Sequence, residues 1–390
     1  MKIAVLTRYF FPQEGGRTIK RGQGADIRVY ELYWRIAENA KVVIVTQKFT
    51  AGEAFSLENL IFSKEEFEGI EVRRVPCGAP FFILTRLPSP FRLWEVIKAA
   101  RGSGVIVAEF HPFHAVGLEA LIAKWLTGKP LVLDVHDIAS GGGGICSSIY
   151  LAYERFAAKN ADGIIATSRE MEGYFRKQGI GCPVAVVENG VDTKGRFYVP
   201  GCKKKLGLEG KVVVGLLGSL TPQHGAEYLI RAFPQILRKF PNAVLLLIGG
   251  GREKEKLEML AKERGVQEKV IFTGLVPYEK VNEYLSACDV LAAPFPKGRE
   301  YTTNLPLKLP EYLAIGKPIV VTNGPVLSRI ATESGAGEVA EAESPESIAK
   351  AVTRALDNPE MGKGGRDYAE KRLEWRALVS RMGKFLRGFA

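Results

Sequence analysis

The stretch from Thr302 to Thr322 holds residue types that could bind a phosphorylated ligand. A loop rich in Thr and Asn leads into a predicted helix with prolines at its start, followed by Glu311, then Gly-Lys-Pro and a buried strand. A helix N-terminus offers free N–H groups to an anion, and Glu311, about two turns along, could accept two hydrogen bonds from a ribose diol. By residue type alone, an ordinary surface glutamate on an amphipathic helix is the simpler interpretation of Glu311.

Glycines follow several predicted strands, where they let a backbone approach a phosphate closely. They are Gly15, Gly16, Gly22 and Gly24 in the first half, and Gly218, Gly225, Gly249, Gly250 and Gly251 in the second. Neither GxGxxG after the first strand nor GxxxxGK[ST] occurs, which argues against nicotinamide, flavin and P-loop enzymes. Tight turns also use glycine without any ligand, so each glycine alone leaves both interpretations open.

The four histidines of the chain stand after strands or before a helix. His136 ends a predicted strand and His224 occupies a turn, so both are candidate catalytic residues, with a structural role as the alternative. His111 and His114 have an H-x-x-H spacing, but the Pro between them and the lack of a third ligand argue against a metal. No D-x-D motif for Mg²⁺ or Mn²⁺ occurs either. We therefore expect no metal cofactor.

Short Val/Ile-rich runs alternate with amphipathic stretches, which predicts α/β domains with doubly wound parallel sheets. Strands are predicted at 2–7, 41–47, 69–75, 105–109, 130–136, 163–168 and 184–188, and then at 212–218, 243–249, 269–273, 290–294 and 318–322. Helices are predicted at 24–38, 225–239, 253–264, 278–287, 307–315, 325–333 and 346–357. Ligands bind outside the carboxyl ends of such strands, so two domains of this kind should face an interdomain cleft.

Length and composition fit two soluble globular domains. The chain has 390 residues, of which 46% are apolar and 25% charged. The segment 189–210 is rich in Gly and Lys and lacks a long apolar period, so we place the domain boundary near residue 188. The stretch 363–390 is basic and predicts a terminal helix.

The cysteine pattern and the net charge indicate the cellular compartment and the kinds of partner that are expected. Five scattered cysteines without a CxxC pair indicate free thiols in a reducing cytosol. No secretion signal and no apolar span of about 18 residues is found, so a cytoplasmic protein is expected. The net charge of +11 is spread over both halves, which argues against a nucleic-acid partner.

Motifs along the whole chain resemble those of glycosyltransferase family four (group 1), the retaining GT-B enzymes. Val135-His136-Asp137 is similar to the family's active-site histidine at a strand end. The stretches Gly218–Phe233 (GSLTPQHGAEYLIRAF) and Pro306–Val321 (PLKLPEYLAIGKPIVV) resemble its two donor-site motifs. Further similar stretches are Tyr9–Pro12, Gln23–Arg28, Glu188–Asp192 and the terminal Trp375.

The resemblance implies two Rossmann-like domains and a metal-independent enzyme that moves a sugar from a nucleotide-diphosphate sugar to an acceptor hydroxyl, with retention. The implied parts are an acceptor-binding domain at 1–188, a nucleotide-sugar-binding domain at 189–362, and a helix at 363–390 that crosses back toward the first domain. A nucleotide-sugar epimerase on the same fold and a non-catalytic nucleotide-sugar-binding protein remain alternatives.

The resemblance also implies a role for each matched position. Glu311 would hold the donor ribose, and His136 would contact the transferred sugar. Gly24, Asn304 and Leu305 would offer backbone N–H groups at helix starts to the diphosphate. Leu275 and Val276 would flank the base. The remaining donor-binding positions are Gly250, Ser219, Thr303 and Lys308.

The chain departs from the family pattern at three of these places. Ser219 and His224 stand where the family usually has an Arg and a Lys, and Thr303 replaces the first of two glutamates. We expect a protonated His224 to help neutralise the leaving diphosphate. Lys308 lies one turn before Glu311 and could restore more of the lost positive charge.

The segment Ala79–Gly102 combines aromatic and basic residues in a way that suits a membrane interface. Its large apolar residues are Phe81, Phe82, Ile83, Leu84, Leu87, Phe91, Leu93 and Trp94, and its cations are Arg86, Arg92, Lys98 and Arg101. By the resemblance it belongs to the acceptor domain, so we expect a lipid-linked acceptor and peripheral contact with the inner face of the cell membrane. The alternative is that the apolar residues pack on the sheet and the cations are merely solvated.

Without a metal, chelation should leave the rate of sugar transfer nearly unchanged. We expect EDTA to alter the rate by no more than about twofold, because loss of an essential ion removes several kcal/mol of transition-state stabilisation. A rate that collapses with EDTA and returns with Mg²⁺ or Mn²⁺ would show this expectation to be wrong.

Overall fold

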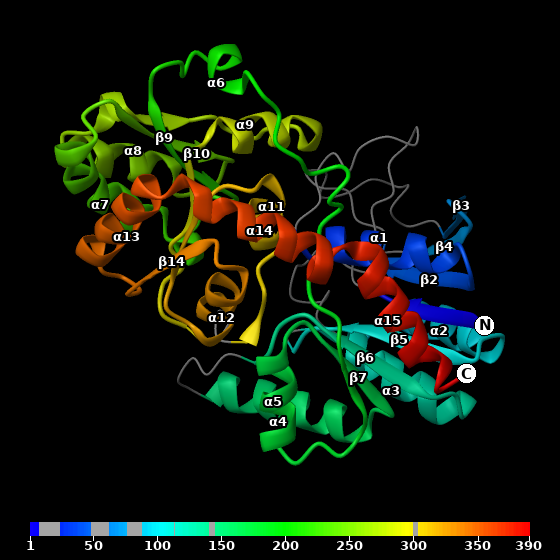
Figure 1. The fold of residues 1–390 in the computed structure, drawn as a ribbon. Coiled ribbons are helices and arrows are strands. Elements are labelled where there is room, and N and C mark those ends of the chain that lie inside the picture. The colour runs from blue at the N-terminus through cyan, green and yellow to red at the C-terminus, as the bar shows by residue number, and fades with distance from the viewer. Residues whose placement is uncertain (8–23, 48–61, 76–87, 113, 140–144, 299–302) are drawn as a thin grey trace. The chain divides into compact units, whose positions relative to one another are not determined.

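Two parallel sheets, each in its own unit of the chain, organise the computed structural model (Figure 1). The structure describes residues 1–7, 24–47, 62–75, 88–112, 114–139, 145–298 and 303–390. One unit comprises Met1–Glu188 with Trp375–Ala390, and the other comprises Asn189–Glu374. The predicted stretches Tyr9–Pro12 and 79–87, Gly15, Gly16 and Gly22 lie outside the described residues.

The first unit contains an eight-stranded sheet in the described part of the chain, in the order β3-β4-β2-β1-β5-β6-β7-β8. Its strands are β1 (Lys2–Leu6), β2 (Lys41–Gln47), β3 (Ser63–Phe67), β4 (Ile70–Val75), β5 (Val105–Phe110), β6 (Leu131–Val135), β7 (Gly163–Ala166) and β8 (Val184–Val186). Its helices are α1 (Gly24–Ala37), α2 (Pro90–Arg101), α3 (Val116–Thr127), α4 (Ile145–Asn160), α5 (Arg169–Lys177) and α15 (Trp375–Arg387). All neighbouring strands are parallel except β3 and β4.

The second unit contains a six-stranded parallel sheet in the order β11-β10-β9-β12-β13-β14. Its strands are β9 (Val212–Leu217), β10 (Ala243–Ile248), β11 (Val270–Phe272), β12 (Val290–Ala293), β13 (Ile319–Thr322) and β14 (Gly337–Ala340). Its α-helices are α6 (Cys202–Lys205), α7 (Ala226–Lys239), α8 (Lys254–Glu263), α9 (Val281–Ala287), α11 (Lys308–Ile315), α12 (Pro325–Ser334), α13 (Pro345–Asp357) and α14 (Gly362–Tyr368). Short 3₁₀ turns occur at Pro222–His224, Gln267–Lys269, Tyr278–Lys280 and Pro359–Met361, and a π turn at Ala369–Leu373.

The predicted strands are present because both faces of each central strand are covered. In β10, every side chain from Ala243 to Ile248 is buried, which explains its unbroken apolar sequence. The strands β3 and β14 were not predicted. In β3 the sequence SKEEF is largely exposed, and the strand is held by antiparallel pairing with β4 across a turn at Glu68 and Gly69, both at positive φ. An exposed edge strand of this kind needs no buried apolar pattern.

The terminal helix predicted at 363–390 is interrupted. After α14 and the π turn, Glu374 adopts an extended conformation, and its carboxylate accepts a hydrogen bond from the Thr193 backbone N–H at 2.9 Å. The helix α15 begins at the buried Trp375 and packs beside α1 within the first unit (Figure 1). A Cβ at Gly163 would lie 2.6 Å from the Phe389 ring, so this glycine makes room for the end of the chain.

The strand order reverses once in each sheet, between β1 and β5 and between β9 and β12. The loops that follow the two strands at such a point leave in opposite directions, and ligands of open parallel sheets bind in the crevice between them. Each unit therefore has one position at which a site is expected. In the described part of the chain, no helix has the length and apolar character needed to cross a membrane.

Candidate functional site

The turn between β9 and α7 lies at the strand-order reversal of the second unit. Gly218 has φ +134° and Gly225 has φ +70°, a region that side chains with a Cβ rarely occupy. A Cβ at Gly225 would lie 1.8 Å from the Pro294 carbonyl oxygen, just after β12. Only glycine lets these two backbones meet, and the meeting brings the loops after β9 and β12 together.

The turn after β10 packs against the same loop. A Cβ at Gly249 would lie 2.2 Å from the Gly218 carbonyl oxygen. A Cβ at the predicted donor residue Gly250 would lie 3.3 Å from the Leu275 side chain, which is 83% exposed. Val276 is partly buried against the core. The structure thus brings Gly250 beside Leu275 and leaves an exposed aliphatic side chain there.

His224 ends the 3₁₀ turn and is partly buried. Its Nδ1 lies 2.7 Å from the Ser219 carbonyl oxygen, which can only accept a hydrogen bond, so Nδ1 carries the proton and Nε2 offers a lone pair. Burial, reinforced by the charge of Lys308, lowers the pKa of His224 to about 4. The imidazole is therefore neutral at pH 7, and the expectation of a protonated His224 is wrong for this structure.

Lys308 is the first residue of α11 and is only 8% exposed. Its Nζ lies 4.9 Å from the centre of the Phe295 ring, and a Cβ at Gly218 would be 3.0 Å from Nζ. The Nζ has no hydrogen-bond partner among the described residues. Burial lowers the pKa of Lys308 to about 7, although Glu311 acts in the opposite direction.

Glu311 stands in the first turn of α11, one turn closer to the helix start than predicted. Its Oε1 lies 3.3 Å from Nη2 of Arg196. Arg196 also donates to Asn282 Oδ1 at 3.0 Å, and its guanidinium lies 4.2 Å from the centre of the Tyr278 ring. The sequence analysis missed Arg196, because no local motif separates it from the other cations of the segment after Asn189.

The residues before α11 do not lie where the sequence predicts them. Since α11 begins at Lys308, Asn304 and Leu305 are not at the helix start. Leu305 is fully buried, and its carbonyl accepts a hydrogen bond from Asn189 Nδ2 at 2.6 Å. Thr303 is buried as well. Packing accounts for the Leu305 side chain, and the role of its backbone N–H stays a prediction.

A second cluster lies at the strand-order reversal of the first unit. Thr7, at the end of β1, donates a hydrogen bond to Glu109 on β5. His136 follows β6, with Nδ1 3.5 Å from Glu109 Oε1 and Nε2 3.3 Å from Asp134 Oδ2. Asp134 also pairs with Arg28 on α1 at 3.0 Å. Gly24 opens the same helix, α1.

The charges of this cluster shift both titrating groups. Burial disfavours the Asp134 carboxylate, but Arg28 and His136 outweigh it and hold the pKa of Asp134 at about 2. Burial likewise disfavours a charged His136, yet Asp134 and Glu109 raise its pKa above the ordinary value. The surroundings of His136 thus favour its charged form, whereas those of His224 favour the neutral form.

The other two histidines do not form a metal site in the described part of the chain. His111 Nε2 lies 3.4 Å from Asp137 Oδ2, and the rings of His111 and His114 are 5.0 Å apart. No three His, Cys, Asp or Glu side chains within the described ranges are grouped so that they could hold a metal ion. Metal independence stays a prediction.

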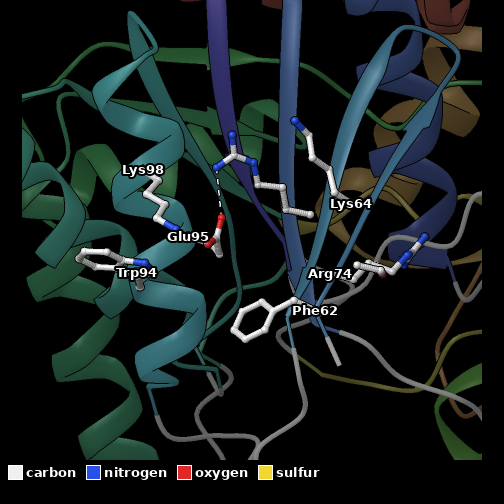
Figure 2. A pocket seen from close by; sticks show the side chains of 8 residues that line it. Phe62, Lys64, Arg74, Trp94, Glu95 and Lys98 are labelled. Atoms are coloured by element: carbon white, nitrogen blue, oxygen red, sulfur yellow. Dashed lines mark hydrogen bonds and ion pairs between the residues drawn. The ribbon is translucent and has the colours of Figure 1, made fainter. Parts of the chain in front are cut away.

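A pocket of about 520 Å³ lies between α2 and the edge strands β3 and β4 (Figure 2). Its lining residues are Phe62, Ser63, Lys64, Arg73, Arg74, Trp94, Glu95 and Lys98. The carboxylate of Glu95, labelled in Figure 2, lies 3.2 Å from Nη1 of Arg73 and 3.1 Å from Nζ of Lys98. The pocket lies away from the strand-order reversal, so we do not assign the donor to it.

Comparison with known proteins decides the family. Residues 21–190 match the model of the glycosyl transferase 4-like domain, and residues 202–372 match that of glycosyl transferases group 1. The chain belongs to the group 1 glycosyltransferases.

Relatives of this glycosyltransferase have names that point to lipid glycosylation. A GDP-mannose-dependent phosphatidylinositol monomannoside mannosyltransferase of Mycolicibacterium smegmatis is 30% identical over 219 residues, which cover 53% of this chain and 57% of the relative. The match therefore spans little more than half the length of that relative.

Solved structures establish the fold of the glycosyltransferase as GT-B. Sucrose-phosphate synthase from Thermosynechococcus elongatus has a TM-score of 0.79 at 20% identity, with 99% of this chain and 98% of that chain covered. Anabaena HepE in complex with UDP has a TM-score of 0.77 at 19% identity, with both chains fully covered at 100%. The predicted pair of parallel-sheet α/β domains is confirmed.

The neutral state of His224 can be measured directly. We expect its ring nitrogens to titrate near pH 4 in an NMR titration, with the resonance assigned by His224→Gln. Lys308→Met should raise the pKa of His224, because a positive neighbour is removed, whereas Lys317→Met should leave it unchanged. The imidazole is then neutral above pH 4 and charged only below it. Titration of His224 near pH 6.5 would contradict this assignment.

Proposed function

We propose that this chain transfers a sugar from a nucleotide-diphosphate sugar to an acceptor hydroxyl, with retention and without a metal. The observation that carries the proposal is the group formed by Lys308, Glu311 and the Gly218 turn at the strand-order reversal of the second unit. A nucleoside diphosphate is bound by features of this kind: a buried cation, a carboxylate, and a glycine turn whose backbone a phosphate can approach closely.

In this proposal each part of the nucleotide sugar is bound by a different side chain. The Lys308 ammonium binds the diphosphate, and Glu311 accepts hydrogen bonds from the ribose. Arg196, 3.3 Å from Glu311, fixes the position of the carboxylate. Leu275, which is 83% exposed beside Gly250, would lose contact with water when the base covers it.

His224 and His136 take different parts because their charges differ. Neutral His224 offers its Nε2 lone pair to a hydroxyl of the donor. His136, whose pKa is raised by Asp134 and Glu109, is proposed to donate a hydrogen bond to the transferred sugar. For this its ring must exchange one of the two carboxylates for the ligand.

Ser219 and Thr303 favour one alternative, a protein that binds the nucleotide sugar without transferring it, because they replace charged residues of the family pattern. An epimerase is the other alternative, and it would release free nucleotide with no acceptor present. Measuring donor turnover with and without acceptor separates the three functions.

Glu311→Ala should slow sugar transfer strongly while the fold survives. Loss of the charge-assisted bonds to the ribose should cost about 2–4 kcal/mol in kcat/KM. Glu338→Ala is the matched control, since Glu338 is also ion-paired in the second unit, with Arg354 at 2.7 Å, but lies on β14. Near-normal kinetics of Glu311→Ala would remove Glu311 from the site, and donor binding without transfer by the unaltered protein would favour the binding-only function.

The acceptor is proposed to be lipid-linked, as the name of the mycobacterial relative says of that protein. On α2, Phe91 is 49% exposed and Trp94 is 53% exposed, and the ring centres of Phe91 and Phe62 are 5.5 Å apart. Lys98 and Arg101 are exposed on the same helix. Aromatic and basic side chains so exposed suit the boundary between headgroups and acyl chains.

Part of the predicted membrane segment does not face the solvent. Arg92 is buried and paired with Glu119, and Leu93 packs against the core. The residues Phe81, Phe82, Ile83, Leu84, Arg86 and Leu87 lie outside the described residues. The proposal of membrane contact therefore rests on Phe91, Trp94 and their basic neighbours.

Liposome flotation tests this contact. The protein should float with vesicles of phosphatidylcholine that contain phosphatidylglycerol, and added salt should weaken binding, because each basic residue contributes about 1 kcal/mol at an anionic surface. The double variant Phe91→Ser/Trp94→Ser should lose binding. The control Trp125→Ser/Phe156→Ser removes another exposed aromatic pair of the same unit, with ring centres 6.4 Å apart, and should retain it. Equal flotation on neutral vesicles, or none at all, would overturn the proposal.

A further inference from the structure

Among the residues that the structure describes, the buried amine of Lys308 has no paired group of opposite charge. Only 8% of the residue is exposed, and Nζ has no hydrogen-bond partner in the described part of the chain. A buried ammonium of this kind loses its hydration shell and gains no counter-ion, which is the most unfavourable state for a charge in a protein.

Within the described ranges, the groups around Nζ come from four elements. The turn after β9 presents Gly218, and the 3₁₀ turn presents the neutral imidazole of His224. The segment after β12 presents the face of the Phe295 ring at 4.9 Å. On α11 itself the charged group is Glu311, whose carboxylate lies 3.3 Å from Arg196.

This arrangement leaves the charge of Lys308 unbalanced. Arg196 already offsets the carboxylate of Glu311, and neither the aromatic ring nor the neutral imidazole brings a formal charge. A cation–π contact with Phe295 favours the ammonium, but by less than a direct ion pair does. The surroundings therefore become favourable to the ammonium only when an anion enters the turn.

We propose that Lys308 is the group that meets the donor's diphosphate and that it takes up one proton from water as the diphosphate binds. The inference rests on the proposed function. In the binding step the neutral amine gains a proton and becomes the ammonium, and no bond of the donor breaks. The two negative charges of the diphosphate then supply the counter-ion that the described residues around Nζ do not.

The direction of the pH dependence follows from this step. In the free protein the pKa of Lys308 is about 7, and ion pairing with the diphosphate raises it. Below pH 7 the amine is already protonated, so donor binding is accompanied by little proton uptake. Above pH 7 binding must bring a proton with it, so affinity should fall as pH rises, approaching about tenfold per pH unit. A nucleotide sugar has no group of its own that titrates near neutrality.

Isothermal titration calorimetry measures the number of protons taken up when the donor binds. GDP-mannose and UDP-glucose are titrated into the full chain at pH 7.5, in two buffers with different ionisation enthalpies. The dependence of the observed heat on the buffer gives the number of protons bound. We expect the protein to take up more than about half a proton per bound donor at this pH, and less at pH 6.

Three variants assign that proton to Lys308. Lys308→Arg keeps a cation that does not deprotonate, so the donor should bind without proton uptake and with an affinity that is flat from pH 6.5 to 8.5. Lys308→Met has a similar volume and no charge, and should lose at least tenfold in affinity. His224→Gln removes the nearest other titrating group and should leave the proton uptake intact.

The outcomes separate the inference from the proposed function. Donor binding without proton uptake, or uptake that persists in Lys308→Met, would overturn the role of Lys308 and leave the glycosyltransferase proposal standing. Loss of uptake in His224→Gln would also overturn it, since the proton would then reside on the imidazole. If the unaltered protein bound neither nucleotide sugar, the proposed donor class itself would fail.

Discussion

The contact between the Gly225 turn and the carbonyl oxygen of Pro294 is the constraint on which the second unit depends. Strand order reverses there, so the loops after β9 and β12 diverge over most of their length. A Cβ at Gly225 would lie 1.8 Å from that oxygen, and no larger residue could hold the two backbones together. Two neighbours of the Lys308 amine are placed by this contact: His224 precedes Gly225 directly, and Phe295 follows Pro294.

The two strand-order reversals have opposite electrostatic character. In the first unit, Asp134 and Glu109 surround His136, with Arg28 as a further cation, and the pKa of Asp134 stays low while that of His136 rises. In the second unit, Lys308 and His224 lie close together with no carboxylate paired to either among the described residues, and both pKa values fall. The first cluster is balanced internally, whereas the second lacks an anion. A diphosphate is the ligand that would complete it.

The sequence could predict the elements whose stability comes from burial, and it missed those that depend on partners distant in the chain. Continuous apolar runs such as β10 were located because both of their faces are covered. The strand β3 was missed because its charged residues are stabilised by pairing with β4, although the Glu68-Gly69 turn is a sequence signal that could have indicated a hairpin. Motifs nominated the candidate site residues, but they carried no information on protonation, since His224 owes part of its low pKa to Lys308 on a different element.

In the proposed donor site, two of the cations that are usual in the family pattern are replaced. Ser219 has no charge, and His224 is neutral at pH 7 because burial and Lys308 both oppose its protonation. A second permanent cation beside Lys308 would raise the cost of the empty site further, since like charges in a poorly solvated space repel strongly. One lysine with a pKa of about 7 can give up its charge in the empty site and regain it with the ligand, which reduces that cost. The loss of fixed positive charge at 219 and 224 and the burial of Lys308 are then two parts of one arrangement, in which the anion itself completes the charge balance of the site.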